Sequence, residues 1–573
     1  MKKRNRILAG MLAVLMTAGL AGCGGGGFGG GAAGMIDKVD ILDIAGFNKD
    51  YLPDVSNIKQ HEGQVDVVIL FDGTEKGWEA LADEYERIQG GYVTVKLDTT
   101  YTNTSIYTDK LRSEVQGNTN WDIVQGNLIG ENMDTYCLNM NSWITGNNPY
   151  AGKGNTWKNV LTENAYITDT SGANSDCYIL NTENLQTAWF VNTVALKAAA
   201  KKGYVNAEGK AENPITWDDM MLLCKKMVEA GYKSPLGIAL SDDSITSNQF
   251  AWLLRVYGDQ YYRQEYENIF AIEGDIAYIE NEYELDLTAT NPEADADFNI
   301  SPTRMFNAIL DDSISNSAYV GAKSDKYAEF IGQFYKMRDY LRVDAANMTL
   351  EDMRNMFTTQ SKGTESPQIM LDYAGSGLSF LASEAENYEI DFYDYPKMVG
   401  NYVSEEAIVR DVGGNGGYLS CVRQDDAQNA LNEDFLKFVL SPYGQSVYYK
   451  ALSENGSAVK GLTTVKTDAV VVPEAWSEFF ATDKIAFNGL VDVNQFISNL
   501  VMYIGSAKVD CQTVSKNLWK QYLTGTGSDA ITTEDYQKEW HDALMDGWKA
   551  TCKNYGYSEE CYMYPGKDLK YSE

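Results

Sequence analysis

The sequence predicts an α/β protein with mostly parallel sheets flanked by helices and a helical section at its C-terminal end. Between residues 65 and 125, β-rich apolar segments alternate with segments whose apolar side chains recur at helical spacing. This strand–helix–strand order is typical of parallel sheets covered by helices on both faces. After residue 435 the apolar positions recur mainly at helical spacing, which predicts the helical section.

The first unit is expected to be βαβαβ. Its strands are predicted at VDVVILF (65–71), YVTVKLD (92–98) and the start of WDIVQGN (121–127), with one amphipathic helix in each interval. The third strand ends in Gln125-Gly126-Asn127, whose two carboxamides each offer donors and an acceptor. Open α/β sheets hold ligands at this edge, although the same residues also suit a plain turn. We expect Asn127 to face a ligand, and Trp121 and Ile123 to hold the sheet.

Further elements follow along the chain. A capping box of Thr216 and Asp219 predicts a helix start within 214–231, and residues 249–262 form an apolar-faced helix that carries Trp252. Strands ending in polar, glycine-rich loops are predicted at 368–377 and 412–421. The acidic stretch 273–299 is interpreted as a solvated insertion. It lacks the glycine and closing glutamate of a calcium loop, so no metal site is predicted.

The N-terminus predicts export. Four basic residues precede a short apolar stretch that ends in Leu20-Ala21-Gly22-Cys23, which looks like a bacterial lipobox. We therefore expect a signal peptide at 1–22, a lipidated (palmitate-type) Cys23 and a flexible glycine-rich linker over 23–64. The expected location is the extracytoplasmic face of the membrane. The alternative is an ordinary signal peptide with a chance cysteine.

The net charge and the cysteine content exclude several classes of ligand and cofactor. The formal charge of −34 includes the four basic residues of the leader, so the chain without it carries −38. Such a surface repels nucleic acid and disfavours strongly anionic ligands, whereas neutral and cationic ligands stay open. Seven further cysteines form no C-x-x-C pair, and the chain has only two histidines, so no zinc site and no cofactor are predicted. Whether Cys552 and Cys561 pair is left open.

Several short motifs, taken in order, resemble the family-1 extracellular solute-binding proteins of sugar transporters, similar to maltose-binding proteins. The resemblance spans roughly residues 65–460 and departs from the family pattern at Trp121, where proline is usual, and at Val191, where tyrosine is usual. The motifs are DGTEKGW (72–78), WDIVQGN (121–127), FVN (190–192), TWDDM (216–220), the Trp252 helix, Asp372-Tyr373 and GGNGG (413–417).

The resemblance implies a two-lobed, periplasmic-binding-protein-like fold that closes on a ligand between its lobes. It places residues 65–180 and 366–415 in lobe 1, and residues 181–365 and 416–573 in lobe 2. It also implies that a monomeric lipoprotein captures a carbohydrate, expected to be an oligosaccharide, and delivers it to the membrane permease of an ABC importer.

The expected ligand-binding residues combine polar groups for sugar hydroxyls with aromatic planes for sugar rings. They are Asp72, Glu75, Trp78, Gln125, Asn127, Trp252, Asp372, Tyr373 and Asn415. Each has a structural alternative. The two tryptophans suit core packing, Glu75 suits the first turn of a helix, Asn127 suits a turn and Asn415 suits a hinge. Lys76 suits solvent more than a ligand.

Three rival functions remain. The same fold could bind a peptide or a polyamine, and the acidic chain favours the second of these. A surface adhesion or sensor role would use the fold without a transporter. A surface glycoside hydrolase or esterase is disfavoured because the G-x-S-x-G nucleophile elbow is absent and neither histidine lies in a recognisable constellation. We therefore expect a binding protein and not an enzyme.

Overall fold

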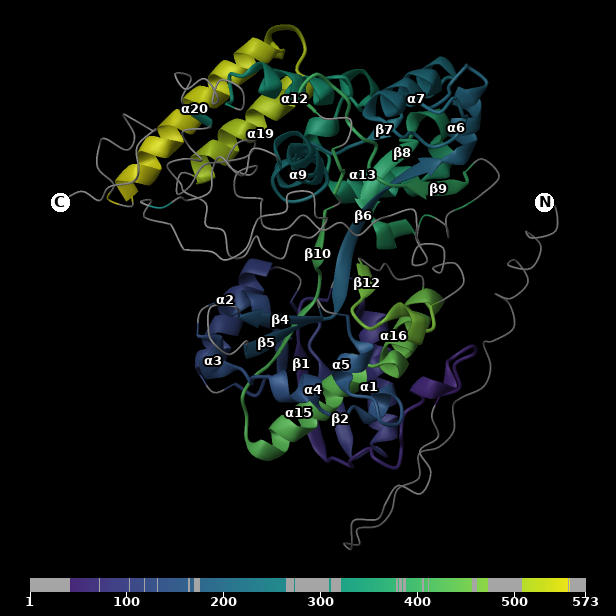
Figure 1. The fold of residues 1–573 in the computed structure, drawn as a ribbon, viewed down its shortest axis with the longest axis vertical. Coiled ribbons are helices and arrows are strands. Elements are labelled where there is room, and N and C mark those ends of the chain that lie inside the picture. Colours follow the sequence, from purple (N-terminus) through teal and green to yellow (C-terminus); the bar gives the residue numbers. More distant parts are fainter. Residues whose placement is uncertain are drawn as a thin grey trace, which may run out of the picture. The chain divides into compact units, whose positions relative to one another are not determined.

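The computed structural model describes most of residues 42–556 (Figure 1). Outside the described residues lie 1–41, 264–308 apart from Glu273, 311–320, 473–507 and 557–573, together with shorter gaps. Outside the described part therefore lie the signal peptide, residues 23–41 of the predicted linker with Cys23, Cys561 and, apart from Glu273, the acidic insertion. Residues 42–64 of that linker are described.

The βαβαβ unit predicted at the start of the body is confirmed. Strand β1 pairs in parallel with β2 and with β3, and Val67 lies opposite both Leu97 and Ile123. The helix between the first two strands buries Trp78, Leu81 and Tyr85, as their spacing predicts. The elements are β1 (Gly63–Val68), α1 (Glu75–Ile88), β2 (Val93–Leu97), α2 (Thr104–Gln116) and β3 (Ile123–Gln125).

Three antiparallel strands complete the first sheet, so this sheet is mixed and not mostly parallel as predicted. Its order is β2-β1-β3-β11-β5-β4, in which β11 pairs antiparallel with both β3 and β5. Helices α15 and α16 pack against β1 and α1. The further elements are β4 (Tyr166–Asp169), β5 (Asp176–Asn181), β11 (Tyr418–Cys421), α3 (Met133–Tyr136), α4 (Asn141–Thr145), α5 (Trp157–Val160), α15 (Asp426–Val439) and α16 (Pro442–Glu454).

The second sheet is built around the long strand β6 and is also mixed. Strands β8, β9, β10 and β12 pair antiparallel with β6, and the short β7 pairs in parallel with β8. The strands are β6 (Glu183–Asn192), β7 (Leu236–Gly237), β8 (Ile369–Tyr373), β9 (Ile390–Tyr393), β10 (Gly413–Asn415) and β12 (Gly461–Thr463).

Helices cover the second sheet. The predicted capping box at Thr216 and Asp219 is present at the start of α7, and α9 buries nearly all of its residues, including Trp252. Such an all-round burial explains why its sequence is apolar on more than one face. The helices are α6 (Thr193–Ala200), α7 (Trp217–Glu229), α8 (Asp242–Thr246), α9 (Gln249–Tyr262), α12 (Asp325–Tyr335) and α13 (Leu350–Thr358).

The helical C-terminal section is confirmed within the described residues. Helix α19 (Lys508–Thr524) packs against α20 (Thr533–Asn554), and both contact α12 (Figure 1). Trp519 and Trp540 lie fully buried in the hydrophobic core of the second sheet. The last helices therefore enlarge that core.

The chain passes between the two sheets at three places. Only Thr182 separates β5 from β6, only Gly416-Gly417 separates β10 from β11, and β12 follows α16. Strand pairing thus puts β8 and β9 in the second sheet and β11 in the first, whereas the expected lobe boundaries assigned β8 and β9 to lobe 1 and β11 to lobe 2. An alternating apolar strand carries no signal for the sheet that it joins, because both sheets offer the same pleated surface.

Candidate ligand-binding site

A cavity of about 320 Å³ lies at the carboxyl ends of β1 and β3. Its walls come from the segment after β1, the N-terminal half of α1, the tip of β3, the crossings at Thr182–Glu183 and Gly416–Gly417, and helix α16. The volume lies at the lower end of the range typical of small-molecule sites. Its position matches the edge of an α/β sheet at which ligands bind.

Three of the residues predicted for the ligand line this cavity, namely Trp78, Gln125 and Asn127. Asn127 is exposed, whereas Gln125 is half-buried and its Oε1 accepts a hydrogen bond from the Leu70 N–H (3.3 Å). Trp78 is only 6 % exposed and packs edge-to-face on Phe71. Trp78 therefore serves the core and lines the cavity at once.

The first loop contributes less than the sequence suggests. Asp72 lies outside the described residues, and Glu75, at the first turn of α1, is half-buried but does not line the cavity. The Lys76 ammonium forms an exposed ion pair with Glu79 (2.6 Å). The alternative of a solvated Lys76 therefore describes this structure.

Asn415 lies at the crossing of the chain between the sheets. Asn181 Nδ2 donates to Asn415 Oδ1 (2.9 Å) and to Asn184 Oδ1 (3.0 Å). A Cβ atom on Gly417 would lie 1.7 Å from the Thr182 hydroxyl oxygen, so glycine is required for this close approach. These contacts hold the 413–417 run at the crossing, and the role of Asn415 as a ligand contact or a hinge stays a prediction.

Trp252 and Tyr373 form an aromatic pair on the second sheet, with ring centroids 4.8 Å apart. Trp252 is 3 % exposed and Tyr373 is half-buried. Burial raises the pKa of Tyr373 to about 12, and the charges of Asp372 and Glu183 add to this rise. Tyr373 therefore lies within electrostatic reach of Glu183, a lining residue of the cavity.

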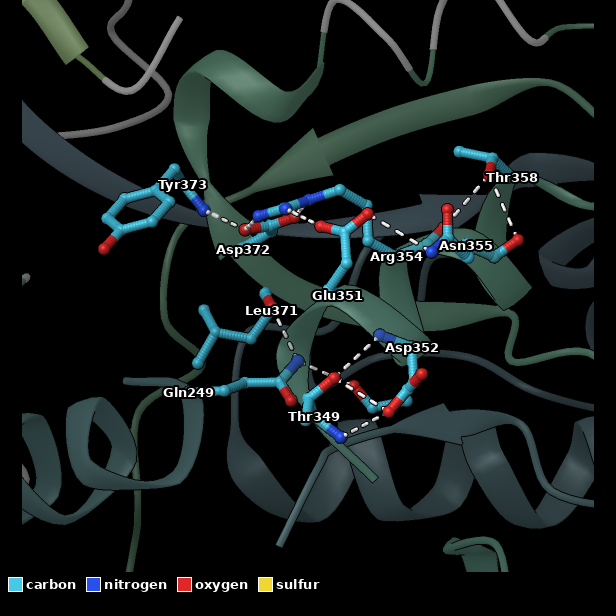
Figure 2. A network of polar contacts seen from close by, with 11 residues as sticks. Gln249, Thr349, Glu351, Asp352, Arg354, Asn355, Thr358, Leu371, Asp372 and Tyr373 are labelled. Atoms are coloured by element: carbon cyan, nitrogen blue, oxygen red, sulfur yellow. Dashed lines mark hydrogen bonds and ion pairs between the residues drawn. The ribbon is translucent and has the colours of Figure 1, made fainter. Parts of the chain in front are cut away.

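Asp372 is fully buried and already satisfied by the chain (Figure 2). The Arg354 guanidinium donates from Nε to Oδ2 (2.8 Å) and from Nη2 to Oδ1 (2.9 Å), and the Tyr373 N–H donates to Oδ1 (2.8 Å). Arg354 also pairs with Glu351. A bidentate pair of this kind fixes geometry, so Asp372 holds the turn at Tyr373 in place.

Sequence reasoning missed seven polar or aromatic residues of the cavity wall: Thr74, Thr182, Glu183, Tyr418, Gln445, Tyr448 and Tyr449. Glu183 is half-buried, its carboxylate accepts from the Gly461 backbone N–H, and burial raises its pKa to about 7. Tyr448 and Tyr449 lie on α16, nearly four hundred residues after β1 along the chain. Nothing in their local sequence marks them, because only the packing of α16 on α1 brings them to the cavity.

The described residues carry neither a metal site nor a spanning helix. No group of three or more His, Cys, Asp or Glu side chains among them is arranged to hold a metal ion. Within the same part of the chain, every helix is too short or too polar to cross a bilayer.

No family model matches the chain, and no curated protein matches it. Among solved structures, the chain is similar to a family 1 extracellular solute-binding protein from Bifidobacterium longum subsp. infantis, at 12 % identity and a TM-score of 0.48, over 85 % of this chain and 100 % of that one. It is also similar to the putative binding protein MsmE of Bacillus subtilis, at 12 % identity and a TM-score of 0.48, over 86 % and 99 % of the two chains.

A third similar structure is BlMnBP1, a binding protein of an ABC transporter from Bifidobacterium animalis subsp. lactis solved with mannotriose. It shows 13 % identity and a TM-score of 0.45, over 86 % of this chain and 97 % of that one.

Proposed function

We propose that this chain is the carbohydrate-binding component of an ABC importer, held at the extracytoplasmic face of the membrane by a lipid on Cys23. The observation that carries the proposal is the cavity at the carboxyl ends of β1 and β3, one wall of which is made by the crossings between the two sheets. A ligand in this cavity touches both a sheet edge and the segments that join the lobes.

The lining chemistry suits a sugar. Trp78, Tyr418 and Tyr448 offer aromatic surface for the apolar face of a ring, while Gln125 and Asn127 offer carboxamides that both donate and accept. Hydroxyl groups require such two-way partners at the rim of a site. The Trp252–Tyr373 pair on the second sheet would add a further aromatic wall on closure.

Ligand capture would be coupled to the arrangement of the lobes through the crossings. Thr182 and Glu183 line the cavity and directly precede or begin β6, which runs through the centre of the second sheet. A ligand that contacts them better in one lobe arrangement shifts the population toward that arrangement. The membrane permease would then recognise the closed form.

The rival binding function, capture of a peptide or a polyamine by the same fold, has weaker support. A peptide carries a carboxylate terminus, which calls for a cationic clamp, and no Lys or Arg is among the described residues that line the cavity. A polyamine would be compatible with the acidic chain. A hydrolase would need a pair of carboxylates across the scissile bond, and Glu183 is the one carboxylate among the described lining residues.

Isothermal titration of the full-length protein in detergent against mono-, di- and trisaccharides, a tripeptide and putrescine tests the proposal. We expect a sugar to bind with micromolar or tighter affinity. Asn127→Ala, in the cavity, should weaken binding by about tenfold, which corresponds to one lost hydrogen bond to the ligand.

Asn57→Ala is the matched control, because Asn57 is exposed and its carboxamide donates to Asp54. It should bind the sugar as the unmodified protein does. If the tripeptide or putrescine binds and no sugar binds, the sugar assignment is wrong. Hydrolysis of a sugar by the pure protein would support the rival glycoside hydrolase function.

A further inference from the structure

Resting on the proposed function, we infer that Glu183 ranks ligands of this cavity by charge: a sugar with a free amino group binds more tightly than its neutral counterpart, and a uronic-acid counterpart is rejected. The inference starts from the place of Glu183. It opens β6, its side chain lines the cavity, and its backbone carbonyl accepts from the Gly416 N–H (2.8 Å). The Glu183 backbone is therefore fixed at the crossing of the chain.

No cation among the described lining residues accompanies this carboxylate. The Gly461 backbone N–H donates to it, and the lining residues within the described part include no Lys, Arg or His. Lys76 lies on α1, two residues before Trp78 of the cavity wall, and it forms an ion pair with Glu79 at the surface. A half-buried carboxylate with no counter-ion among the described lining residues leaves room for a ligand that brings the positive charge.

Aromatic rings line the same cavity as the carboxylate. Tyr448 and Tyr449 line the same cavity, and burial raises the pKa of both phenols, with the charge of Glu183 adding to the rise. These hydroxyls therefore stay neutral and supply no positive charge. Trp78 and Tyr418 add further ring surface. Aromatic faces attract an ammonium group through their quadrupole, so the rings and the carboxylate favour the same kind of ligand.

The ranking by charge follows from these contacts. A hydroxyl of a neutral sugar can donate to Glu183 but leaves its charge uncompensated in a partly desolvated site. An ammonium group makes a charge-assisted hydrogen bond, which is roughly twice as strong as a neutral one. A ligand carboxylate would instead repel Glu183, and the net charge of −34 acts in the same direction.

The test compares three disaccharides with one β-1,4 skeleton: the glucosamine disaccharide with free amines, cellobiose and cellobiouronic acid. Putrescine and glutarate serve as a skeleton-free pair of opposite charge. Titration near neutral pH should give an amino-sugar Kd about tenfold to a hundredfold lower than that of cellobiose, with the uronic acid weakest. Glu183→Gln, which keeps the shape and removes the charge, should bring the three affinities together.

Glu75→Gln is the control for charge near the cavity, since Glu75 is half-buried on α1 but does not line the cavity. It should keep the ranking. Equal affinities in the unmodified protein, or a ranking that survives in Glu183→Gln, would overturn the inference and leave sugar binding intact. Putrescine binding that depends on Glu183, without any sugar binding, would keep the inference and overturn the proposed function. Binding of none of the probes would overturn both.

Discussion

The Glu183→Gln variant should change how the stability of the protein depends on pH. Burial raises the pKa of Glu183 to about 7, from an ordinary value of 4.5. A carboxyl with a raised pKa contributes stability that is fully present below the unfolded value, and that is lost as pH rises through the folded value. The free energy of unfolding should therefore decrease between about pH 4.5 and about pH 7. Glutamine does not titrate, so the variant should lack this loss.

The size of the effect follows from the two pKa values. The difference between about 7 and 4.5, at about 1.4 kcal/mol for each pKa unit, gives about 3 kcal/mol as an upper bound. Glu183 is only half-buried, so solvent screening reduces this figure, and we expect about 1–3 kcal/mol. Among the described residues, the groups facing Glu183 are the phenols of Tyr448 and Tyr449, the Gly461 N–H and, at longer range, Tyr373. None of them carries a positive charge.

Urea unfolding followed by tryptophan fluorescence at about pH 5, pH 6, pH 7 and pH 8 measures this difference. The variant should gain stability over the unmodified protein as pH rises and plateau above about pH 7. Glu79→Gln removes an exposed carboxyl paired with Lys76 and should follow the unmodified protein, because exposed ion pairs contribute little. Parallel pH courses for Glu183→Gln and the unmodified protein would show that the Glu183 carboxyl is not desolvated, which would refute the reasoning.

Three further predictions concern the aromatic pair, the crossing and the anchor. Trp252→Ala should weaken sugar binding at least tenfold and, because the ring is only 3 % exposed, should also lower the free energy of unfolding by about 3–5 kcal/mol. Binding is measured by titration of protein that circular dichroism shows to be folded, and an unchanged Kd would show that Trp252 does not contact the ligand. Gly461→Ala should lower the free energy of unfolding in urea by about 1–3 kcal/mol, because the added Cβ would lie 1.9 Å from the Asn184 carbonyl oxygen. Gly332→Ala, with open space around the added Cβ, should not destabilise the protein, and equal stability of the two variants would contradict the prediction. Cys23→Ser should move the protein from the membrane fraction to the soluble fraction, and retention in the membrane would refute the lipid anchor.

Local patterns carried most of the correct predictions about the fold. The βαβαβ unit follows from the apolar spacing of α1 and α2 and from the β-branched strands between them, since each element buries its own stripe. The capping box at Thr216 is equally local, because both partners lie within one turn. These signals need no knowledge of distant contacts.

Contacts between distant segments could not be predicted in the same way. The pairing of β11 with β3 joins residues about three hundred positions apart, and nothing in the sequence at Tyr418–Cys421 selects β3 over β6 as a partner. The same holds for Tyr448 and Tyr449, which reach the cavity through α16. Asp372 was predicted as a ligand contact because its acidic side chain lies at the end of a strand. Nothing in the sequence indicates that Arg354 lies beside it and donates to both of its carboxylate oxygens.

The polar tip of β3, Gln125-Gly126-Asn127, depends both on its local sequence and on contact with the distant strand β11. Gly126 has to be glycine, because a Cβ atom there would lie 1.8 Å from the Ser420 hydroxyl oxygen of β11. That close approach holds the tip against the sheet, and Gln125 strengthens it by accepting from Leu70. Asn127 is the tip residue left to solvent, and it lines the cavity. The packing of the first two residues thus positions the third, so a change at Gly126 should weaken ligand binding through Asn127 without touching the ligand itself.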